Sequence, residues 1–320
     1  MSDYFDSFIG QAAVKRRLTF FINDYKKTYQ LPPILLSTAK GGGKTSIAKM
    51  LAKHLNHKHL DSIRPLVEVN CSVIKSMKQW ASLYNQYIHN NDVTLLLDEA
   101  SELPHDVSMA LLTILNTGGN PVREFKHEDI TQIWDFTRCS IIFATTEPDK
   151  VNHALIDRLT VVEFEAYSPK ELGEIVRLNV AANNPDVTIS DEVMDVLIKT
   201  VRGNPRSAVH AANNICAYLR QVETNELTIQ GWHDLCHNLD INKNGLQHSE
   251  VIVLRALVNR GGSASLQALS AMTGLTRTAL QRGVENFLLA RGFLEIKGNR
   301  HITHEGRLAL KELEEKVVLS

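Results

Sequence analysis

The sequence has few cysteines and no long apolar segment. Its four cysteines lie far apart in a chain of 320 residues. So sparse a set argues against a disulfide-rich secreted domain and favours a reducing, cytoplasmic setting. No apolar run approaches the length of a membrane span, and the first residues lack the basic and apolar segments of a secretory signal. We therefore expect a cytoplasmic protein with no membrane partner.

Net charge is also almost absent. The chain carries 35 Lys and Arg against 36 Asp and Glu, and its pI is about 6.9. A nearly neutral chain has no general attraction for nucleic acid, so DNA binding would need a local patch of cations. The length and the 43% share of hydrophobic residues indicate a globular protein of two or three domains.

A glycine-rich segment is the most informative feature that is present. Residues 37–46 read Ser-Thr-Ala-Lys-Gly-Gly-Gly-Lys-Thr-Ser, between an apolar run and a stretch with helical spacing. Strand, glycine-rich loop and helix is the context of a phosphate-binding loop, whose backbone N–H groups hold anionic phosphates. We expect Lys44 to reach the β- and γ-phosphates of ATP and Thr45 to help hold Mg²⁺. The predicted nucleotide contacts of this loop are Gly41, Gly42, Gly43, Lys44, Thr45 and Ser46.

The loop departs from the usual pattern at one position. Thr38 occupies the first glycine position of G-x-x-x-x-G-K-[ST], a change that could reduce nucleotide affinity. The three consecutive glycines supply conformational freedom, since glycine tolerates positive φ. An alternative interpretation is a glycine-rich turn before an ordinary helix.

A second motif follows at the end of an apolar run. Residues 93–97 are typical of a buried strand, and Asp98 and Glu99 come directly after it. Asp98 is placed to hold Mg²⁺, and Glu99 to polarise the water that attacks the γ-phosphate. Two solvated acids at a strand end are the alternative. Together, in this order, the two motifs predict an ATPase.

Apolar patterning predicts an α/β fold followed by two smaller domains. Residues 1–166 alternate short apolar runs with helical patterns, as in a parallel sheet with helices on both faces. Residues 167–242 read as a helical lid domain. Residues 243–320 read as a winged helix-turn-helix domain, with helical patterns before a short hairpin that turns at Gly298-Asn299.

The third domain is locally basic. Residues 276–290 occupy the position of a recognition helix, and the hairpin adds cations at the tip of the wing. Such a patch suits sequence-independent contact with DNA phosphates. Solvated charges on a domain used for protein contacts are the alternative. The predicted DNA-binding residues are Arg277, Gln281, Arg282, Lys297 and Arg300.

In these motifs the chain resembles the AAA+ ATPases and, within them, the RuvB family of Holliday-junction branch-migration motors. The resemblance covers nearly the whole chain and implies ATP and Mg²⁺ as cofactors. Residues 8–11, Phe-Ile-Gly-Gln, resemble the family's turn beside the adenine, which implies nucleotide contacts from Ile9 and Gln11. Tyr167, at the hinge after the core, could pack against adenine or serve as a core or hinge tyrosine.

Three further segments resemble the family's catalytic motifs. Phe-Ala-Thr-Thr at 143–146 resembles sensor 1, which implies that Thr145 orients the water or the γ-phosphate. Arg158 resembles the arginine finger, which acts on a neighbouring subunit's nucleotide. Gly-Asn-Pro-Arg at 203–206 resembles sensor 2, which implies a cis role for Arg206 and a nucleotide contact for Pro205. An exposed arginine at a helix end is the alternative for each arginine.

The resemblance implies a ring, expected to be a hexamer, that moves on duplex or branched DNA to drive branch migration, with a junction-targeting partner like RuvA. Three departures bear on this. Ile156 replaces a second arginine, and Ala-Ser-Glu at 100–102 replaces the family's Ile-His-Arg. The family docks RuvA through a hairpin with an apolar tip, whereas residues 126–129 here are charged. That segment is either a hairpin for an absent or different partner, or a plain loop.

Two rival functions stay open from the sequence. One is a loader or remodeller of a replicative helicase or clamp, and the other is an ATP- and DNA-binding scaffold without turnover. Two histidine-containing clusters, at 54–59 and 233–237, lack the four-ligand spacing of a structural zinc site, so we expect ordinary surface or half-buried histidines.

Overall fold

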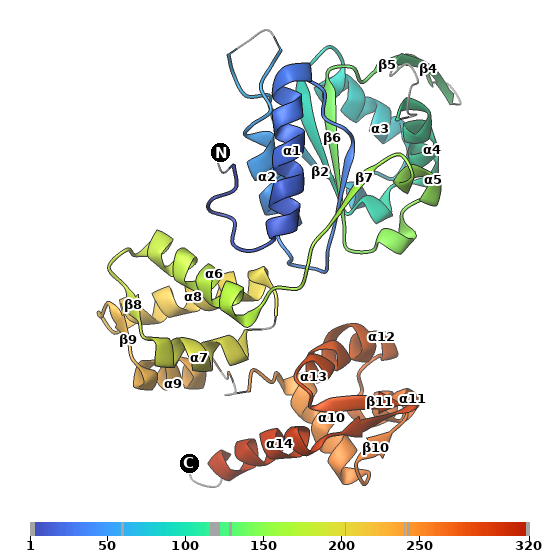
Figure 1. The fold of residues 1–320 in the computed structure, drawn as a ribbon. Coiled ribbons are helices and arrows are strands. Elements are labelled where there is room, and N and C mark those ends of the chain that lie inside the picture. Colours follow the sequence, from blue (N-terminus) through green and yellow to red (C-terminus); the bar gives the residue numbers. More distant parts are fainter. Residues whose placement is uncertain are drawn as a thin grey trace. The chain divides into compact units, whose positions relative to one another are not determined.

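The structure is a computed structural model that describes residues 4–58, 61–115, 122–127, 130–201, 203–239, 241 and 244–317. The chain divides into two compact units (Figure 1). One comprises Met1–Glu171 with Asn204–Arg206, and the other comprises Leu172–Gly203 with Ser207–Ser320. The division of the second unit into a lid and a winged-helix domain at residue 242 stays a prediction.

The first unit contains a five-stranded parallel sheet with the order β2-β3-β6-β1-β7. A strand that is buried on both faces needs apolar side chains at successive positions, and the sequence supplies them. All four residues of β1 are buried. The strands are β1 (Ile34–Ser37), β2 (Leu66–Asn70), β3 (Val93–Asp98), β6 (Cys139–Thr145) and β7 (Thr160–Glu163).

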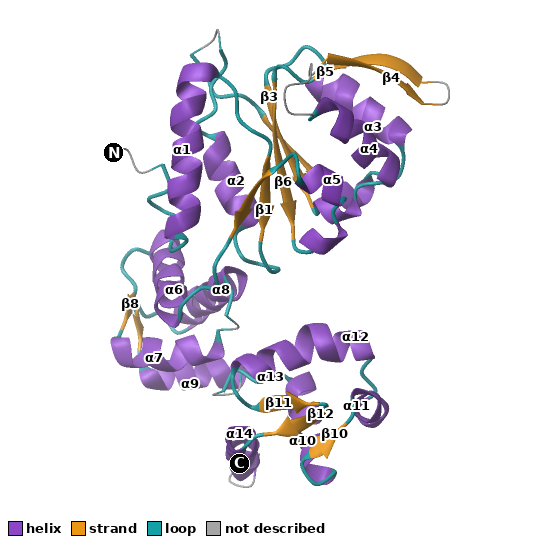
Figure 2. Cartoon of the chain, turned by 45° about the vertical axis from the view of Figure 1, so that its right-hand side comes forward, coloured by secondary structure: helices purple, strands orange, loops and turns teal. Residues whose placement is uncertain are grey.

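Helices cover both faces of this sheet (Figure 2). Successive strand residues point to opposite faces, so Ile34 and Leu36 pack in one core cluster while Leu35 packs in the other. The expected α/β architecture is confirmed. One face carries α1 (Ala12–Thr28) and α2 (Lys44–Ala52), and the other carries α3 (Met77–Leu83), α4 (His105–Ile114) and α5 (His153–Ile156). Short helical turns lie at Cys71–Val73, Tyr84–Ile88, Ala100–Glu102 and Pro148–Lys150.

The segment before β6 is a hairpin and not a plain loop. Strands β4 (Val122–His127) and β5 (Ile130–Asp135) pair in antiparallel register, and the buried Trp134 anchors the second strand. Ile133 on the same strand is 62% exposed. Residues 128–129, in the predicted charged tip, lie outside the described residues.

Helices follow the sheet and make up the first part of the second unit. Ser168 and Glu171, at the end of the first unit, form a reciprocal cap at the start of the first of these helices. A two-residue parallel pair, β8 (Thr188–Ile189) with β9 (Glu226–Leu227), joins two loops and was not foreseen in a segment expected to be all helical. The helices are α6 (Pro169–Asn183), α7 (Asp191–Thr200), α8 (Pro205–Gln221) and α9 (Ile229–Asn238).

The remainder of the chain is a winged helix. Its three-stranded sheet has the order β10-β12-β11, and Gly298 at φ 72° forms the turn of the wing. The expected continuous helix over 276–290 is interrupted by a π turn, η5 (Leu280–Glu285), which corrects that expectation. The other elements are α10 (His248–Asn259), β10 (Ser263–Ala264), α11 (Leu266–Thr273), α12 (Arg277–Ala279), α13 (Asn286–Ala290), β11 (Leu294–Lys297), β12 (Asn299–Ile302) and α14 (His304–Val317). In the part of the chain that the structure describes, no helix is both long and apolar enough to cross a membrane.

Candidate functional site

The glycine-rich loop joins β1 to α2 at the carboxyl edge of the sheet. Gly41 and Gly43 adopt left-handed φ angles of 81° and 98° that other residues rarely adopt. A Cβ on Gly42 would lie 2.5 Å from the Thr38 hydroxyl. Thr38 therefore fits in place of the usual first glycine because residue 42 has no side chain. Ser46 lies exposed in the first turn of α2.

Lys44 is buried at the start of α2. Its ammonium group donates a hydrogen bond of 3.1 Å to the carbonyl of Thr38, so it lies along the loop. Burial lowers the pKa of Lys44, while the carboxylates of Glu99 and Asp98 oppose that shift. The loop thus places the partly desolvated ammonium group of Lys44 beside a backbone whose shape suits phosphate.

Thr45 and Asp98 converge from two elements. The Thr45 hydroxyl lies 3.1 Å from the carboxylate of Asp98, the last residue of β3. One hydroxyl and one carboxylate fit Mg²⁺, which takes oxygen ligands and usually completes its shell with phosphates and water. Among the described residues there is no group of three or more His, Cys, Asp or Glu that could hold a metal ion.

Glu99 is held by the second threonine of the sensor-like segment. Glu99 has a left-handed φ of 53°, and its carboxylate accepts a hydrogen bond of 3.3 Å from Thr146. Thr145 is fully buried, where its hydroxyl donates to Ser101 at 3.2 Å and accepts from the Glu147 amide at 3.0 Å. The structure therefore gives Thr146, and not Thr145, the contact with Glu99. Strand alternation, by which neighbouring residues face opposite ways, was the signal available in the sequence.

Arg206 reaches the loop from a distant part of the chain. Its amide donates to the Gly41 carbonyl at 3.3 Å, and a Cβ on Gly41 would lie 2.8 Å from the Asn204 side chain. The cation of Arg206 also contributes to lowering the pKa of Lys44. Pro205 starts α8 between them. The sensor 2-like segment thus lies against the phosphate loop, and the cis role of Arg206 stays a prediction.

The residues predicted near the adenine, Ile9 and Gln11, are half-buried and buried. Gln11 is buried, and its amide makes two hydrogen bonds, of 2.8 and 2.9 Å, with the backbone of Glu165. Its side chain therefore ties the N-terminal turn to the segment after β7, and a nucleotide contact by Gln11 stays a prediction. Ile9 beside it is half-buried.

Two aromatic rings lie against the loop. The Tyr167 hydroxyl donates to the Gly42 carbonyl at 3.2 Å, and burial raises the pKa of Tyr167 to about 12. A Cβ on Gly43 would lie 3.0 Å from the ring of Phe8. Phe8 was not predicted as a site residue, although its position in the Phe-Ile-Gly-Gln turn was the available signal. The contact of Tyr167 with the loop was not predicted, and packing of its ring against adenine stays a prediction.

Arg158 follows α5, where its guanidinium donates to the Ala154 carbonyl at 2.6 Å. Its Nε atom is buried and has no hydrogen-bond partner among the described residues. Ile156, at the position of the family's second arginine, packs against the core. A single chain contains no neighbouring nucleotide, so the trans role of Arg158 stays a prediction.

The predicted DNA-binding residues separate into two groups. Arg277, Gln281 and Arg282 are exposed along the helix, and the Lys297 side chain is 70% exposed at the wing, 2.9 Å from Glu295. Arg300 differs, because its side chain is only 12% exposed. Its guanidinium donates to both carboxylate oxygens of Glu285, at 2.8 and 3.2 Å. This pair corrects the expectation that Arg300 is free to bind phosphate.

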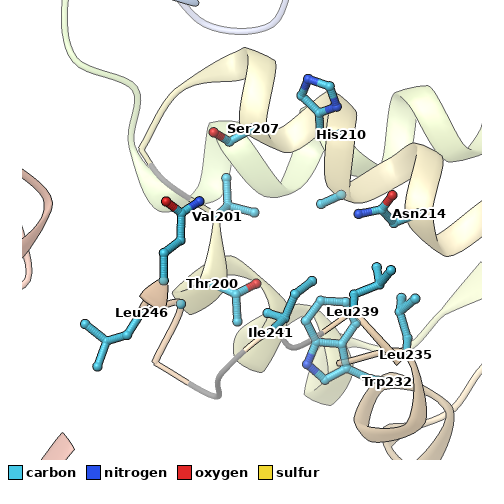
Figure 3. Close-up of a pocket in the computed structure, with 13 residues that line it drawn as sticks. Thr200, Val201, Ser207, His210, Asn214, Trp232, Leu235, Leu239, Ile241 and Leu246 are labelled. Atoms are coloured by element: carbon cyan, nitrogen blue, oxygen red, sulfur yellow. The ribbon is translucent and has the colours of Figure 1, made fainter. Parts of the chain in front are cut away.

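A cavity of about 490 Å³ lies within the second unit (Figure 3). Trp232 and Leu235 of α9 supply its apolar wall, and His210 and Asn214 of α8 supply polar groups. Residues 245–247 also line it. No residue predicted for nucleotide or DNA contact is among its lining, so the cavity adds nothing to either site.

Comparison with known proteins finds a family match in each of two parts of the chain. Residues 34–167 match the ATPase family associated with various cellular activities, and residues 243–311 match the RuvB C-terminal winged helix domain. The Holliday junction branch migration complex subunit RuvB of Thermotoga petrophila is 28% identical over 298 residues, which cover 90% of this chain and 85% of that protein.

Two other relatives agree with this result. RuvB of Kosmotoga olearia is 26% identical over 316 residues, which cover 96% of this chain and 86% of that protein. The solved structure of the Thermotoga maritima RuvB Holliday junction branch migration motor is 25% identical. It matches with a TM-score of 0.76 over 97% of each chain.

Proposed function

Because the chain is a RuvB-like ATPase of the AAA+ superfamily, we propose that it is a motor that uses ATP to move on duplex DNA and to drive branch migration of Holliday junctions. The observation that carries the proposal is the convergence of Lys44, Thr45, Asp98 and Arg206 on one glycine-rich loop, in a chain that also has a winged helix. The relatives named for branch migration support the choice of substrate.

Each polar group at the loop has a role in hydrolysis under this proposal. Hydrolysis places negative charge on the γ-phosphoryl oxygens, and positioned cations lower that barrier. Lys44 and Arg206 supply such cations within one chain. Glu99 polarises the attacking water, and Thr146 holds the Glu99 carboxylate through its hydroxyl. Thr45 and Asp98 would hold Mg²⁺, which neutralises phosphate charge when it is bound.

Arg158 completes the site from a neighbouring subunit in this proposal. A trans arginine makes hydrolysis a property of the interface, so the working form is a ring, which we propose is a hexamer around DNA. Arg206, at the start of α8, couples nucleotide state to the lid helices. Repeated lid movement would draw duplex DNA past the winged helices. Little sequence preference is expected, because phosphate contacts read no bases.

The β4–β5 hairpin is the proposed docking element for a junction-targeting protein. Its strands pair as in a rigid arm, and β5 exposes Ile133. The Lys126 side chain on β4 is 68% exposed and pairs with Glu124. A charged arm argues for a partner whose docking surface is more polar than one that receives an apolar tip. The cytoplasmic location expected from the sparse cysteines also stays a prediction.

The first experiment measures ATP turnover without DNA, with duplex, and with a mobile four-way junction, and follows junction dissociation in the same samples. Lys44→Ala serves as the control. The proposal expects DNA-stimulated turnover together with junction dissociation. Turnover without dissociation would favour a loader or remodeller. No turnover above the Lys44→Ala control would leave an ATP- and DNA-binding scaffold.

A further inference from the structure

The buried ion pair of the winged helix lies where an exposed DNA contact was expected. Glu285 and Arg300 have side chains only 5% and 12% exposed, and two hydrogen bonds of 2.8 and 3.2 Å join them. Burying two charges costs free energy that their attraction only partly recovers, so stability alone does not explain such a pair. Glu285 instead lies on the predicted recognition helix and Arg300 on the wing, which are the two elements that a winged helix offers to DNA.

The π turn explains how Glu285 comes to face inward. Leu280 and Val284 are buried on the core side of the helix, and the wide turn that ends at Glu285 adds a residue to that side. Local π turns are rare and occur frequently at functional sites. Glu285 is thus buried in the helix that carries Arg277, Gln281 and Arg282 on its exposed face.

Arg300 belongs to the central strand of the wing sheet. It is the register partner of Ala264 on β10 and of Ile296 on β11, so its backbone is held from both sides. Two residues before it, Gly298 turns the wing, and Lys297 projects from the tip. A side chain anchored in this strand fixes the angle between the wing and the helix. The fork of a guanidinium on a carboxylate restricts that angle more than a single bond does.

We propose that Glu285 and Arg300 are positioning residues that hold the wing against the recognition helix, so that Lys297 and Arg277 meet DNA phosphates at a fixed spacing. Neither member of the pair touches DNA. The inference rests on the proposed function, because it assumes that this surface binds duplex DNA. In this proposal the pair raises the affinity for DNA by preorganisation, because a wing that is already fixed loses less conformational freedom on binding.

The test uses the full chain and a duplex of fixed length, with affinity measured over a range of salt concentrations. The variants are Glu285→Gln, Arg300→Gln, both together, and Arg300→Lys, and Lys297→Gln is the matched control. A lost phosphate contact lowers the slope of log affinity against log salt by about 0.9. We expect that decrease for Lys297→Gln alone.

For the pair, we expect an affinity loss of about tenfold at every salt concentration, with the salt slope unchanged. Glu285→Gln should weaken binding although it makes the domain more positive, and the double variant should be no weaker than either single one. Arg300→Lys keeps the charge but cannot form both bonds, so it should also lose affinity. The thermal unfolding midpoint of each variant shows that the comparison is made on folded protein.

The opposite pattern would overturn the inference. If Arg300→Gln lowers the salt slope as Lys297→Gln does, while Arg300→Lys keeps wild-type affinity, then Arg300 itself binds phosphate. Unchanged affinity in all the pair variants would make the pair a purely structural element. Absence of DNA binding by the unaltered chain would overturn the proposed function as well, whereas the first two results leave that function standing.

Discussion

The nucleotide site and the winged helix differ in how directly their sequences reveal their surfaces. At the phosphate loop, Lys44 and Asp98 lie where their motifs place them, because the backbone of a strand–loop–helix unit sets their positions. In the winged helix, Arg300 was expected at the surface and lies buried against Glu285. The contrast shows that a contiguous motif fixes a backbone shape, whereas a count of surface cations leaves side-chain direction open.

The largest expected effect comes from removing Arg158, the arginine that is proposed to complete a neighbouring subunit's nucleotide site. Arg158→Ala should lower turnover about 10³-fold or more while ATP binding persists, because a trans arginine stabilises charge that develops only in the transition state. Turnover and nucleotide binding are measured separately. Mixing Arg158→Ala chains with Lys44→Ala chains should restore part of the turnover, since some interfaces then have both groups. No restoration, or lost binding with intact turnover, would contradict the trans role.

A smaller effect separates the two threonines that follow one another at the end of β6. Thr146→Val should lower turnover by about tenfold to a hundredfold, because Glu99 loses its hydrogen-bond donor. Thr145→Val should instead lower the free energy of unfolding by about 1–2 kcal/mol, because it removes the buried hydroxyl that bonds the Ser101 hydroxyl and the Glu147 amide. Turnover and denaturant unfolding of both variants decide the matter. A larger loss of turnover in Thr145→Val than in Thr146→Val would support the sensor role that the resemblance implies for Thr145.

The exposed helix of the winged domain supplies the third comparison. Arg277→Gln should lower DNA affinity by a few-fold at low salt and reduce the salt slope by about 0.9, because Arg277 is exposed on the predicted recognition helix. ATP turnover without DNA should not change. Binding isotherms at several salt concentrations measure the slope. A slope equal to that of the unaltered chain would place DNA on another face of the domain.

The last comparison concerns a charge network in the first unit that belongs neither to the nucleotide site nor to the proposed DNA surface. Hydrogen bonds from Arg138 at 2.8 Å and His57 at 3.0 Å hold the pKa of Asp92 at about 2, despite its burial. Because the pKa of Asp92 is lower in the folded state than in the unfolded state, its ionised form stabilises the fold at pH values above the unfolded pKa. This contribution is lost as the pH falls toward 2. Asp92→Asn should therefore lower the free energy of unfolding by about 1–2 kcal/mol at neutral pH.

The measurement for Asp92 is a series of unfolding titrations from neutral pH to about pH 2. The difference between Asp92→Asn and the unaltered chain should shrink below about pH 4, where the unfolded carboxyl takes up its proton. Turnover at neutral pH should stay close to that of the unaltered chain. A difference that is independent of pH would mean that side-chain shape, and not charge, accounts for the effect.

Much of the fold and part of the site followed from the sequence. The alternation of apolar strands and helical patterns predicted the α/β core, and the hairpin with its Gly298 turn predicted the wing. The π turn could not be predicted, because the apolar spacing of Leu280, Val284 and Leu288 fits an ordinary helix. The bonds between the Gln11 side chain and the backbone of Glu165 could not be predicted either, because they join residues far apart in the chain.

The sequence by itself determined the phosphate loop, the paired acids and the order of domains, since each depends on residues that are neighbours in the chain. Only the tertiary structure decided which side chains meet. It brought Arg206 to Gly41, chose Thr146 over Thr145 for Glu99, and turned Arg300 toward Glu285. These pairings depend on strand register and on helix rotation. A shift of one residue turns a strand's side chains to the opposite face, and local spacing in the sequence specifies neither register nor rotation.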